Sequence, residues 1–262
     1  MLPVAILLGI VEGATEFLPI SSTGHLILAG WLVGFQGNKA ATFEIFIQLG
    51  AILAVIWVYR QKFWKLLTNR SETRFSGRRG LNLLAITTIP ALVLGFLLHG
   101  VIKQFLFNPT TVAIGLLVGG IVMLIIERRA KNETTLSLDD LTLKQALGVG
   151  LAQTLALFPG ISRSGATIMG GITLGINRET AVEYSFLAAV PIMLAATGYD
   201  LLKALPSLSE SDVPFFAVGL ISAFISALVV MRWLLKYVRR HNFVPFAWYR
   251  IALGVIVLIL SR

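Results

Sequence analysis

Apolar runs of membrane-spanning length constrain the fold of this chain more than any other feature. About 20 predominantly apolar residues suffice to cross a bilayer as a helix. Six runs come close to that length or exceed it: residues 43–59, 81–99, 110–127, 181–202, 213–235 and 244–260. Only 13% of the 262 residues are charged, whereas a soluble domain carries about 25%. Because lipid offers no hydrogen-bond partners to an open strand, the sequence predicts an all-α integral membrane protein with six transmembrane helices, folded as a single membrane domain over residues 1–262.

Two further apolar regions are interrupted in the middle, so neither can cross the bilayer as one helix. Residues 1–33 are broken near Pro19, and residues 145–176 are broken at Pro159 and Gly160. Each half is about a dozen residues long, which is too short for a spanning helix. We interpret both regions as re-entrant helix-loop-helix pairs that enter and leave the membrane by the same face.

The two halves of the chain present the same order of elements. Each half contains a re-entrant pair followed by three spans, which places pseudo-repeat 1 at about residues 1–130 and pseudo-repeat 2 at about residues 140–262. The segments IPALVLG, ending at Gly95, and VPFFAVG, ending at Gly219, share one Pro-to-Gly spacing. Three crossings per half is an odd number, so the halves must insert in opposite orientations. This is an inverted-topology repeat, whose site is expected near the midplane.

The distribution of basic residues predicts the orientation. Of 22 Lys and Arg residues, sixteen lie in segments on one side, among them Arg60, Arg70, Lys131 and Arg239, and four lie on the other, at Lys39, Lys103, Lys203 and Arg262. Cytoplasmic loops carry the excess of positive charge, so both termini should lie outside, and the first helix pair should open its pocket toward the periplasm. Arg250 is expected to snorkel near a span end. The net charge of +9 is accounted for in this way, and nucleic acid is excluded as a partner.

Both interrupted regions carry polar loops at membrane depth, where such groups are costly and usually functional. The first loop holds Ser21, Ser22, Thr23 and Gly24, and the second surrounds Arg163 with Ser162, Ser164, Gly165 and Thr167. A helix start offers free N–H groups to an anion, so we expect both loops to bind phosphate. Two simpler readings stay open: the hydroxyl groups act only as helix caps, or Arg163 forms only a salt bridge to Glu12 or Glu16.

Five more polar residues complete the candidate site. Glu12 and Glu16 are four apart and share a helix face, which suits a divalent cation, Mg²⁺ or Ca²⁺, shared with substrate phosphates. His25 follows Ser22 by three positions, so the two side chains can meet as base and nucleophile. Glu44 and Gln48 could support the site from behind, or they could make a contact between helices. The aromatic residues Trp57, Tyr199, Trp233, Trp248 and Tyr249 are expected to be interfacial anchors outside the site.

These motifs resemble a known family. EGATEFLPISSTGH (Glu12 to His25) and PGISRSGAT (Pro159 to Thr167) are similar to the two signatures of the bacterial undecaprenyl-diphosphate phosphatases, also called UppP or BacA. TFEIFIQLGAILAV from Thr42 and VPFAWYR from Val244 look similar too, so the likeness extends over essentially the whole chain.

The resemblance implies an enzyme of the bacterial inner membrane that removes the terminal phosphate of undecaprenyl diphosphate. This reaction recycles the lipid carrier for cell-wall synthesis, and overexpression of such an enzyme gives resistance to bacitracin. Glu12, Ser22, His25 and Arg163 would be catalytic, and Ser162 and Thr167 would bind the diphosphate. A divalent cation is implied as cofactor, the partners would be the polyprenyl substrate and bilayer lipids, and a homodimer is left open. The alternative is a secondary transporter or flippase for a lipid-linked or anionic substrate, because that class also joins inverted repeats and broken helices.

Overall fold

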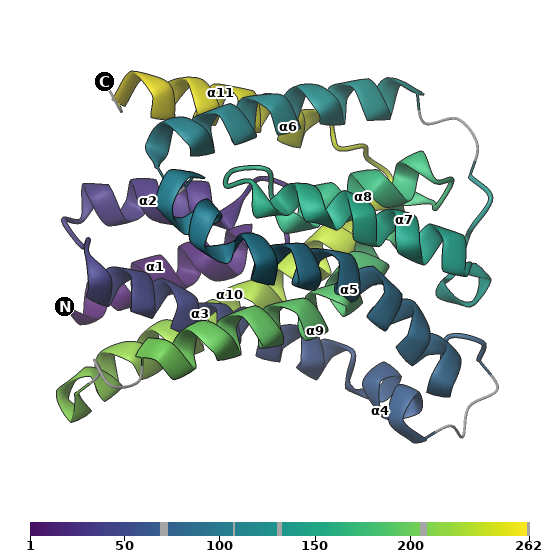
Figure 1. Cartoon of the computed structure of the whole chain (residues 1–262), viewed down its shortest axis with the longest axis horizontal. Helices are drawn as coiled ribbons and strands as arrows, with labels where there is room; N and C mark the ends of the chain where they lie inside the picture. The colour runs from purple at the N-terminus through teal and green to yellow at the C-terminus, as the bar shows by residue number, and fades with distance from the viewer. Residues whose placement is uncertain (69–72, 107, 130–132, 205–208, 261–262) are drawn as a thin grey trace.

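The chain folds into a bundle of helices in the computed structural model, which describes residues 1–68, 73–106, 108–129, 133–204 and 209–260 (Figure 1). Arg70, Lys131 and Arg262 lie outside these residues. The longer elements are α1 (Leu2–Thr15), α2 (Ser22–Leu32), α3 (Asn38–Val58), α4 (Arg60–Thr68), α5 (Gly77–Val101), α6 (Pro109–Arg129), α7 (Leu143–Thr154), α8 (Arg163–Thr173), α9 (Arg178–Ala204), α10 (Val213–Val238) and α11 (Val244–Leu260). The described part contains no β-strand apart from one isolated bridge between Thr135 and Ile176.

Five helices are long and apolar enough to cross a membrane, and the chain is therefore a multi-pass membrane protein. They are α3, α5, α6, α9 and α10, which match five of the six predicted spans. The sixth predicted span is α11, a shorter apolar helix of 17 residues that lies alongside α6 (Figure 1).

Each interrupted region forms two short helices around a loop. Pro19 and the residues beside it separate α1 from α2, and Pro159 and Gly160 lie between α7 and α8. Ser21 caps α2 with φ 71°, and Ser162 caps α8 with φ 75°. Among the described residues these are the only two outside glycine with positive φ. Such a backbone is costly for an L side chain and tends to occur at functional sites. The same rare conformation thus occurs at matching positions of the two loops.

The packing pairs of the first half have counterparts in the second half. α1 packs along α10, and α7 packs along α5, while α3 meets α9 and α6 meets α11. The approach of α1 to α10 depends on small residues, because a Cβ added at Gly13 would overlap the backbone carbonyl of Ala223. Close packing on α10 fixes the polar residues that α1 carries at its C-terminal end.

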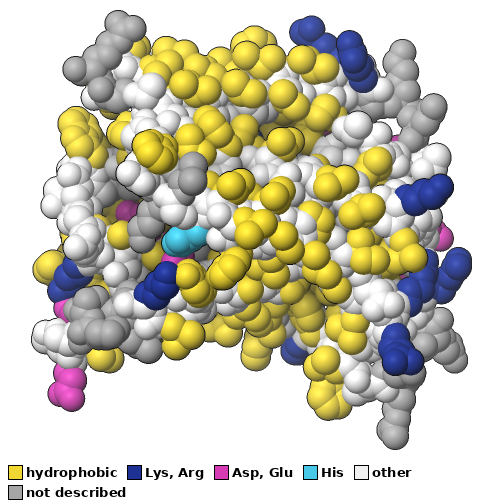
Figure 2. Space-filling model, in the orientation of Figure 1, with side chains coloured by type: hydrophobic (Ala, Val, Ile, Leu, Met, Phe, Trp, Pro, Cys, Tyr) yellow, Lys and Arg dark blue, Asp and Glu magenta, His cyan; other side chains and the backbone are white. Residues whose placement is uncertain are grey.

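Charge divides the molecule into two ends. Lys and Arg side chains gather at the end where α4 lies, and a broad apolar surface separates them from the opposite end (Figure 2). The N-terminus and the end of α11 both lie at that opposite end (Figure 1). At the basic end Arg178 pairs with the buried carboxylate of Glu127 at 2.6 Å, and this carboxylate also accepts from the N–H of Phe243. This second contact places the start of α11.

Candidate active site

The two polar loops, far apart in the sequence, meet inside the bundle. The Ser164 hydroxyl donates to the carbonyl of Leu18 at 2.8 Å. One guanidinium nitrogen of Arg163, Nη2, donates to Glu16 Oε1 at 3.0 Å. Both contacts join the second loop to the first, so the residues that the sequence analysis assigned to one site do come together.

Glu16 lies at the centre of this meeting. Its Oε1 accepts from Arg163, and its Oε2 accepts from the hydroxyl of Ser22 at 2.6 Å. A short hydrogen bond to an ionised acceptor is a strong one. The Ser22 oxygen is therefore held beside a carboxylate that can take its proton.

Glu12 has a different environment, although it shares a helix face with Glu16. It is fully buried, and neither carboxylate oxygen has a hydrogen-bond partner in the described part of the chain. The charges that act on it come from Glu16, Glu44 and Arg163. A buried carboxylate without partners is costly unless a proton or a cation is present, so Glu12 fits a cation that also binds substrate oxygens. No three acidic or histidine side chains among the described residues gather closely enough to hold a metal by themselves.

Arg163 is anchored on both sides of its fork. Nη1 donates to the carbonyl of Ser185 on α9 at 3.0 Å, while Nη2 binds Glu16. The guanidinium also lies 5.7 Å from the centre of the Phe17 ring. Its Nε is buried without an acceptor. The salt bridge to Glu16 that the sequence analysis left open is therefore present, and one N–H remains for a ligand.

The hydroxyl groups of the second loop mainly hold that loop together. Ser162 accepts from the N–H of Gly165 as a helix cap and lies 3.0 Å from the Ser164 hydroxyl. Thr167 binds the Ser185 hydroxyl at 2.7 Å, which positions the partner of Arg163. These contacts correspond to the capping reading. In the first loop Thr23 is partly exposed, and Gly24 packs against α6.

His25 does not meet Ser22 in the way its spacing suggested. Its Nδ1 lies 2.7 Å from the carbonyl of Ser21, and its Nε2 lies 2.7 Å from the hydroxyl of Tyr249. A carbonyl only accepts, so Nδ1 carries a proton, and Nε2 of the neutral ring accepts from Tyr249. The Tyr249 ring also stacks on the imidazole at 5.5 Å. The expectation that Tyr249 lies outside the site is wrong, because residues 224 positions apart in sequence are brought together by tertiary packing.

Glu44 and Gln48, both on α3, differ in their contacts. Gln48 accepts from the Thr197 hydroxyl on α9 at 3.3 Å, which is the contact between helices that the sequence left open. Glu44 is partly exposed and acts on Glu12 only through its charge.

Arg250 does not snorkel as expected. Its side chain is 1% exposed and donates to the carbonyls of Pro19, Gly115 and Gly160. The sequence carried one signal for this position: Arg250 lies within an apolar run and could not be assigned to a loop on either side of the membrane. Only the fold brings three backbone acceptors within its reach.

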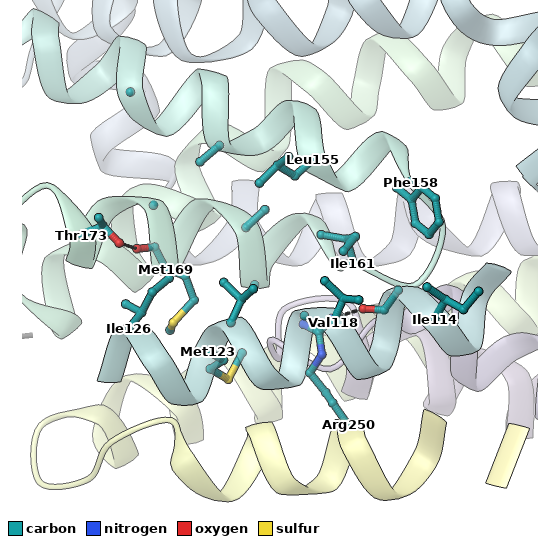
Figure 3. A pocket seen from close by; sticks show the side chains of 18 of the residues that line it. Ile114, Val118, Met123, Ile126, Leu155, Phe158, Ile161, Met169, Thr173 and Arg250 are labelled. Carbon is teal, nitrogen blue, oxygen red and sulfur yellow. Dashed lines mark hydrogen bonds between the residues drawn. The ribbon is translucent and has the colours of Figure 1, made fainter. Parts of the chain in front are cut away.

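An apolar groove of about 650 Å³ opens beside the second loop. α6 forms one wall with Ile114, Val118 and Met123, and the opposite wall includes Phe158 and Ile161 of the loop (Figure 3). Arg250 is the only charged side chain in its lining. The groove therefore presents a mainly apolar surface beside the second loop.

Comparison with known sequences gives the family. The sequence model of a family described as bacitracin resistance protein BacA matches residues 5–256. The chain belongs to this family. Proteins named undecaprenyl-diphosphatase from Desulfovibrio desulfuricans and Nitrosomonas europaea are 55% and 52% identical to it. Those alignments cover 97% of this chain and 96% and 93% of the two relatives. Membership of the BacA family confirms the resemblance that the two loop motifs indicated.

Proposed function

We propose that this chain hydrolyses undecaprenyl diphosphate, the substrate stated in the name of its relatives. The products are undecaprenyl phosphate and inorganic phosphate. One observation carries the proposal: the chain of contacts from Ser22 through Glu16 to Arg163, which joins a hydroxyl, a carboxylate and a fork of donors inside a membrane protein. Together these supply a nucleophile, a base and a phosphate anchor. The product would return to cell-wall synthesis in the bacterial inner membrane.

The first step forms a bond between Ser22 Oγ and the terminal phosphorus and breaks the bond from that phosphorus to the bridging oxygen. The Ser22 proton passes to Glu16 Oε2, which is 2.6 Å away. Undecaprenyl phosphate departs with the bridging oxygen and needs no proton to leave. Arg163 and the N–H groups at the start of α8 stabilise the equatorial oxygens, since electrostatics dominate phosphoryl transfer.

The second step releases the phosphate. A water attacks the phosphoserine, its proton passes to His25 Nε2 and from there to solvent, and the bond between phosphorus and Oγ breaks as Glu16 returns its proton to Ser22. Tyr249, whose hydroxyl now occupies Nε2, would have to turn aside or relay that proton. In a variant of this mechanism water attacks the diphosphate directly, and Ser22 only orients it.

A divalent cation fits beside Glu12, whose two oxygens have no partner among the described residues. Both oxygens of Glu16 are already engaged, so Glu12 would hold the ion together with substrate oxygens. When bound, the ion would neutralise part of the diphosphate charge.

The polyprenyl tail is proposed to lie in the apolar groove between α6 and the second loop. Its lining includes Phe158 and Ile161 of the second loop, which precede Arg163 in the sequence. Its volume of about 650 Å³ lies within the range of roughly 300–1,000 Å³ usual for ligand pockets. A tail there would stay within the membrane during turnover.

A tryptophan at Val118, on the groove wall, should therefore raise KM for the long-chain substrate and leave KM for a C15 diphosphate unchanged. A tryptophan at Val229, on the lipid-facing side of α10, should leave KM for both substrates unchanged.

The two helix pairs are proposed to be re-entrant, and the two halves to form an inverted repeat. The matched backbone at Ser21 and Ser162 and the paired packing of α1 with α10 and α7 with α5 support this. α11 would provide the sixth crossing, because 17 residues lie at the lower limit for a span. The pocket would open outward, at the end opposite the basic loops. The homodimer stays a prediction.

Phosphate release by the purified protein in detergent tests this function. A detergent micelle has no second compartment, so a transporter or flippase would release nothing from undecaprenyl diphosphate. We expect turnover that a chelator abolishes reversibly, and a higher cation requirement in Glu12→Gln. Full activity in the presence of a chelator would exclude the cation but leave the phosphatase. An absence of phosphate release under all cation conditions would favour the transporter.

A further inference from the structure

Arg250 has contacts that the proposed chemistry does not use. Its Nη1 donates to Pro19 O at 3.1 Å, and its Nη2 donates to Gly115 O at 3.2 Å and to Gly160 O at 3.0 Å. These acceptors belong to the first loop, to α6 and to the second loop. One guanidinium therefore binds both phosphate loops and the helix beside them. No other side chain in the described residues donates hydrogen bonds to the backbone of all three segments.

The residues around Arg250 offer hydrogen-bond acceptors to its guanidinium and leave space for it. Arg250 is 1% exposed, and its described contacts include no carboxylate. An isolated charge in such a place is costly, so the three carbonyls must stabilise it. Glycines leave the space it fills: a Cβ added at Gly119 would overlap Nη2, and one added at Gly165 would lie 2.9 Å from Nη1. Figure 3 shows the side chain rising from α11 toward α6.

The positions of the three acceptors connect Arg250 to the reacting groups. Pro19 O lies three residues before Ser22, and Gly160 O lies three residues before Arg163. A shift of either loop would therefore change the distance between Ser22 and the fork that holds the phosphate. Such reactions lose about 10²-fold in rate for a misplacement near 1 Å.

We propose that Arg250 is a positioning residue that sets the spacing of the two phosphate-binding loops without contacting the reacting diphosphate. The inference rests on the proposed phosphatase function. It assigns to α11 the task of joining the two pseudo-repeats at the site, in addition to its packing against α6. The geometry of the fork is what matters, because a single ammonium group cannot reach three carbonyls on separate elements.

Two variants separate geometry from charge. Arg250→Lys keeps the charge but loses the fork. Gly119→Ala keeps the arginine but places a methyl group where Nη2 now lies. Gly198→Ala on α9 is the matched control, since a Cβ there would meet nothing within 4 Å.

Full-length variants are purified in detergent, and kcat and KM are measured per folded molecule with undecaprenyl diphosphate. We expect Arg250→Lys and Gly119→Ala each to lower kcat about 10²-fold with KM nearly unchanged, and Gly198→Ala to match the parent. Amide hydrogen exchange around residues 16–24 and 158–165 should become faster in both variants.

Three results would overturn the proposal. The first is a parental kcat in folded Arg250→Lys. The second is a rise in KM with an unchanged kcat, which would make Arg250 a substrate-binding residue. The third is loss of folded protein in both variants while Gly198→Ala folds normally, which would make it a folding residue. If the parent protein releases no phosphate, the proposed phosphatase function is contradicted instead. This outcome is distinguished from failure of the positioning role, because the Gly198→Ala control would then be inactive as well.

Discussion

At the scale of single residues, the site depends on which partner each polar group has found. Glu12 and Glu16 share a helix face, yet one is without partners and the other has both oxygens engaged. That difference is the reason for proposing Glu12 as the cation ligand and Glu16 as the base. The same reasoning separates Arg163, which retains a free N–H, from Ser164 and Thr167, whose hydroxyls are bound within the protein.

Arg163→Lys should lose activity even though the charge is kept. A lysine cannot bind Glu16, Ser185 and a phosphate oxygen at once, and removing one donor from a transition-state site costs about 10²–10³ in kcat. Arg239→Lys, in an exposed pair with Glu179, is the control and should keep parental kinetics. Turnover of folded Arg163→Lys near the parental rate would remove Arg163 from the phosphate site.

Tyr249→Phe should have a smaller effect. The stacked ring stays in place, but His25 Nε2 loses its donor. One hydrogen bond is worth about 0.5–1.5 kcal/mol, so kcat should fall roughly 2- to 12-fold. Tyr199→Phe, on a tyrosine that contacts His99 and Lys203, should leave kcat unchanged. If both variants behave alike, Tyr249 has no role in orienting His25.

At the scale of elements, short helices are held by close contacts with long ones. α1 is a short apolar helix of 14 residues, and its position depends on Gly13 meeting the backbone of α10. Because α1 carries Glu12 close to that contact, a change at this interface should affect the candidate site as well as stability.

Gly13→Ala should therefore destabilise the protein. The added methyl group would overlap the carbonyl of Ala223, and overpacking of this kind costs about 1–3 kcal/mol. The melting temperature in detergent should fall. Gly198→Ala has open space and should be neutral or stabilising, since alanine is favoured in helices by about 1 kcal/mol. Equal melting temperatures for the two variants would contradict the close packing of α1 on α10.

At the scale of the whole molecule, orientation follows from charge, because positive loops remain in the cytoplasm. The chain has no cysteine, so a single one introduced by mutation is a unique label. Lys39→Cys should react with an impermeant reagent in intact cells, and Arg239→Cys should react only after lysis. The reverse pattern would place the termini and the pocket in the cytoplasm.

The sequence alone determined the fold class, five of the spans, the breaks at Pro19 and Pro159, and the residues of both loops. These features are local, since they depend on run length, on helix breakers and on polar groups at membrane depth. Most contacts inside the site join residues far apart in the sequence, although Ser22 and Glu16 lie only six positions apart, across the break at Pro19. Ser22 met Glu16 in place of His25, His25 met Tyr249, and Arg250 turned inward. Only tertiary packing decides these, because each partner lies on a different element, and helical spacing says nothing about what a neighbouring helix presents.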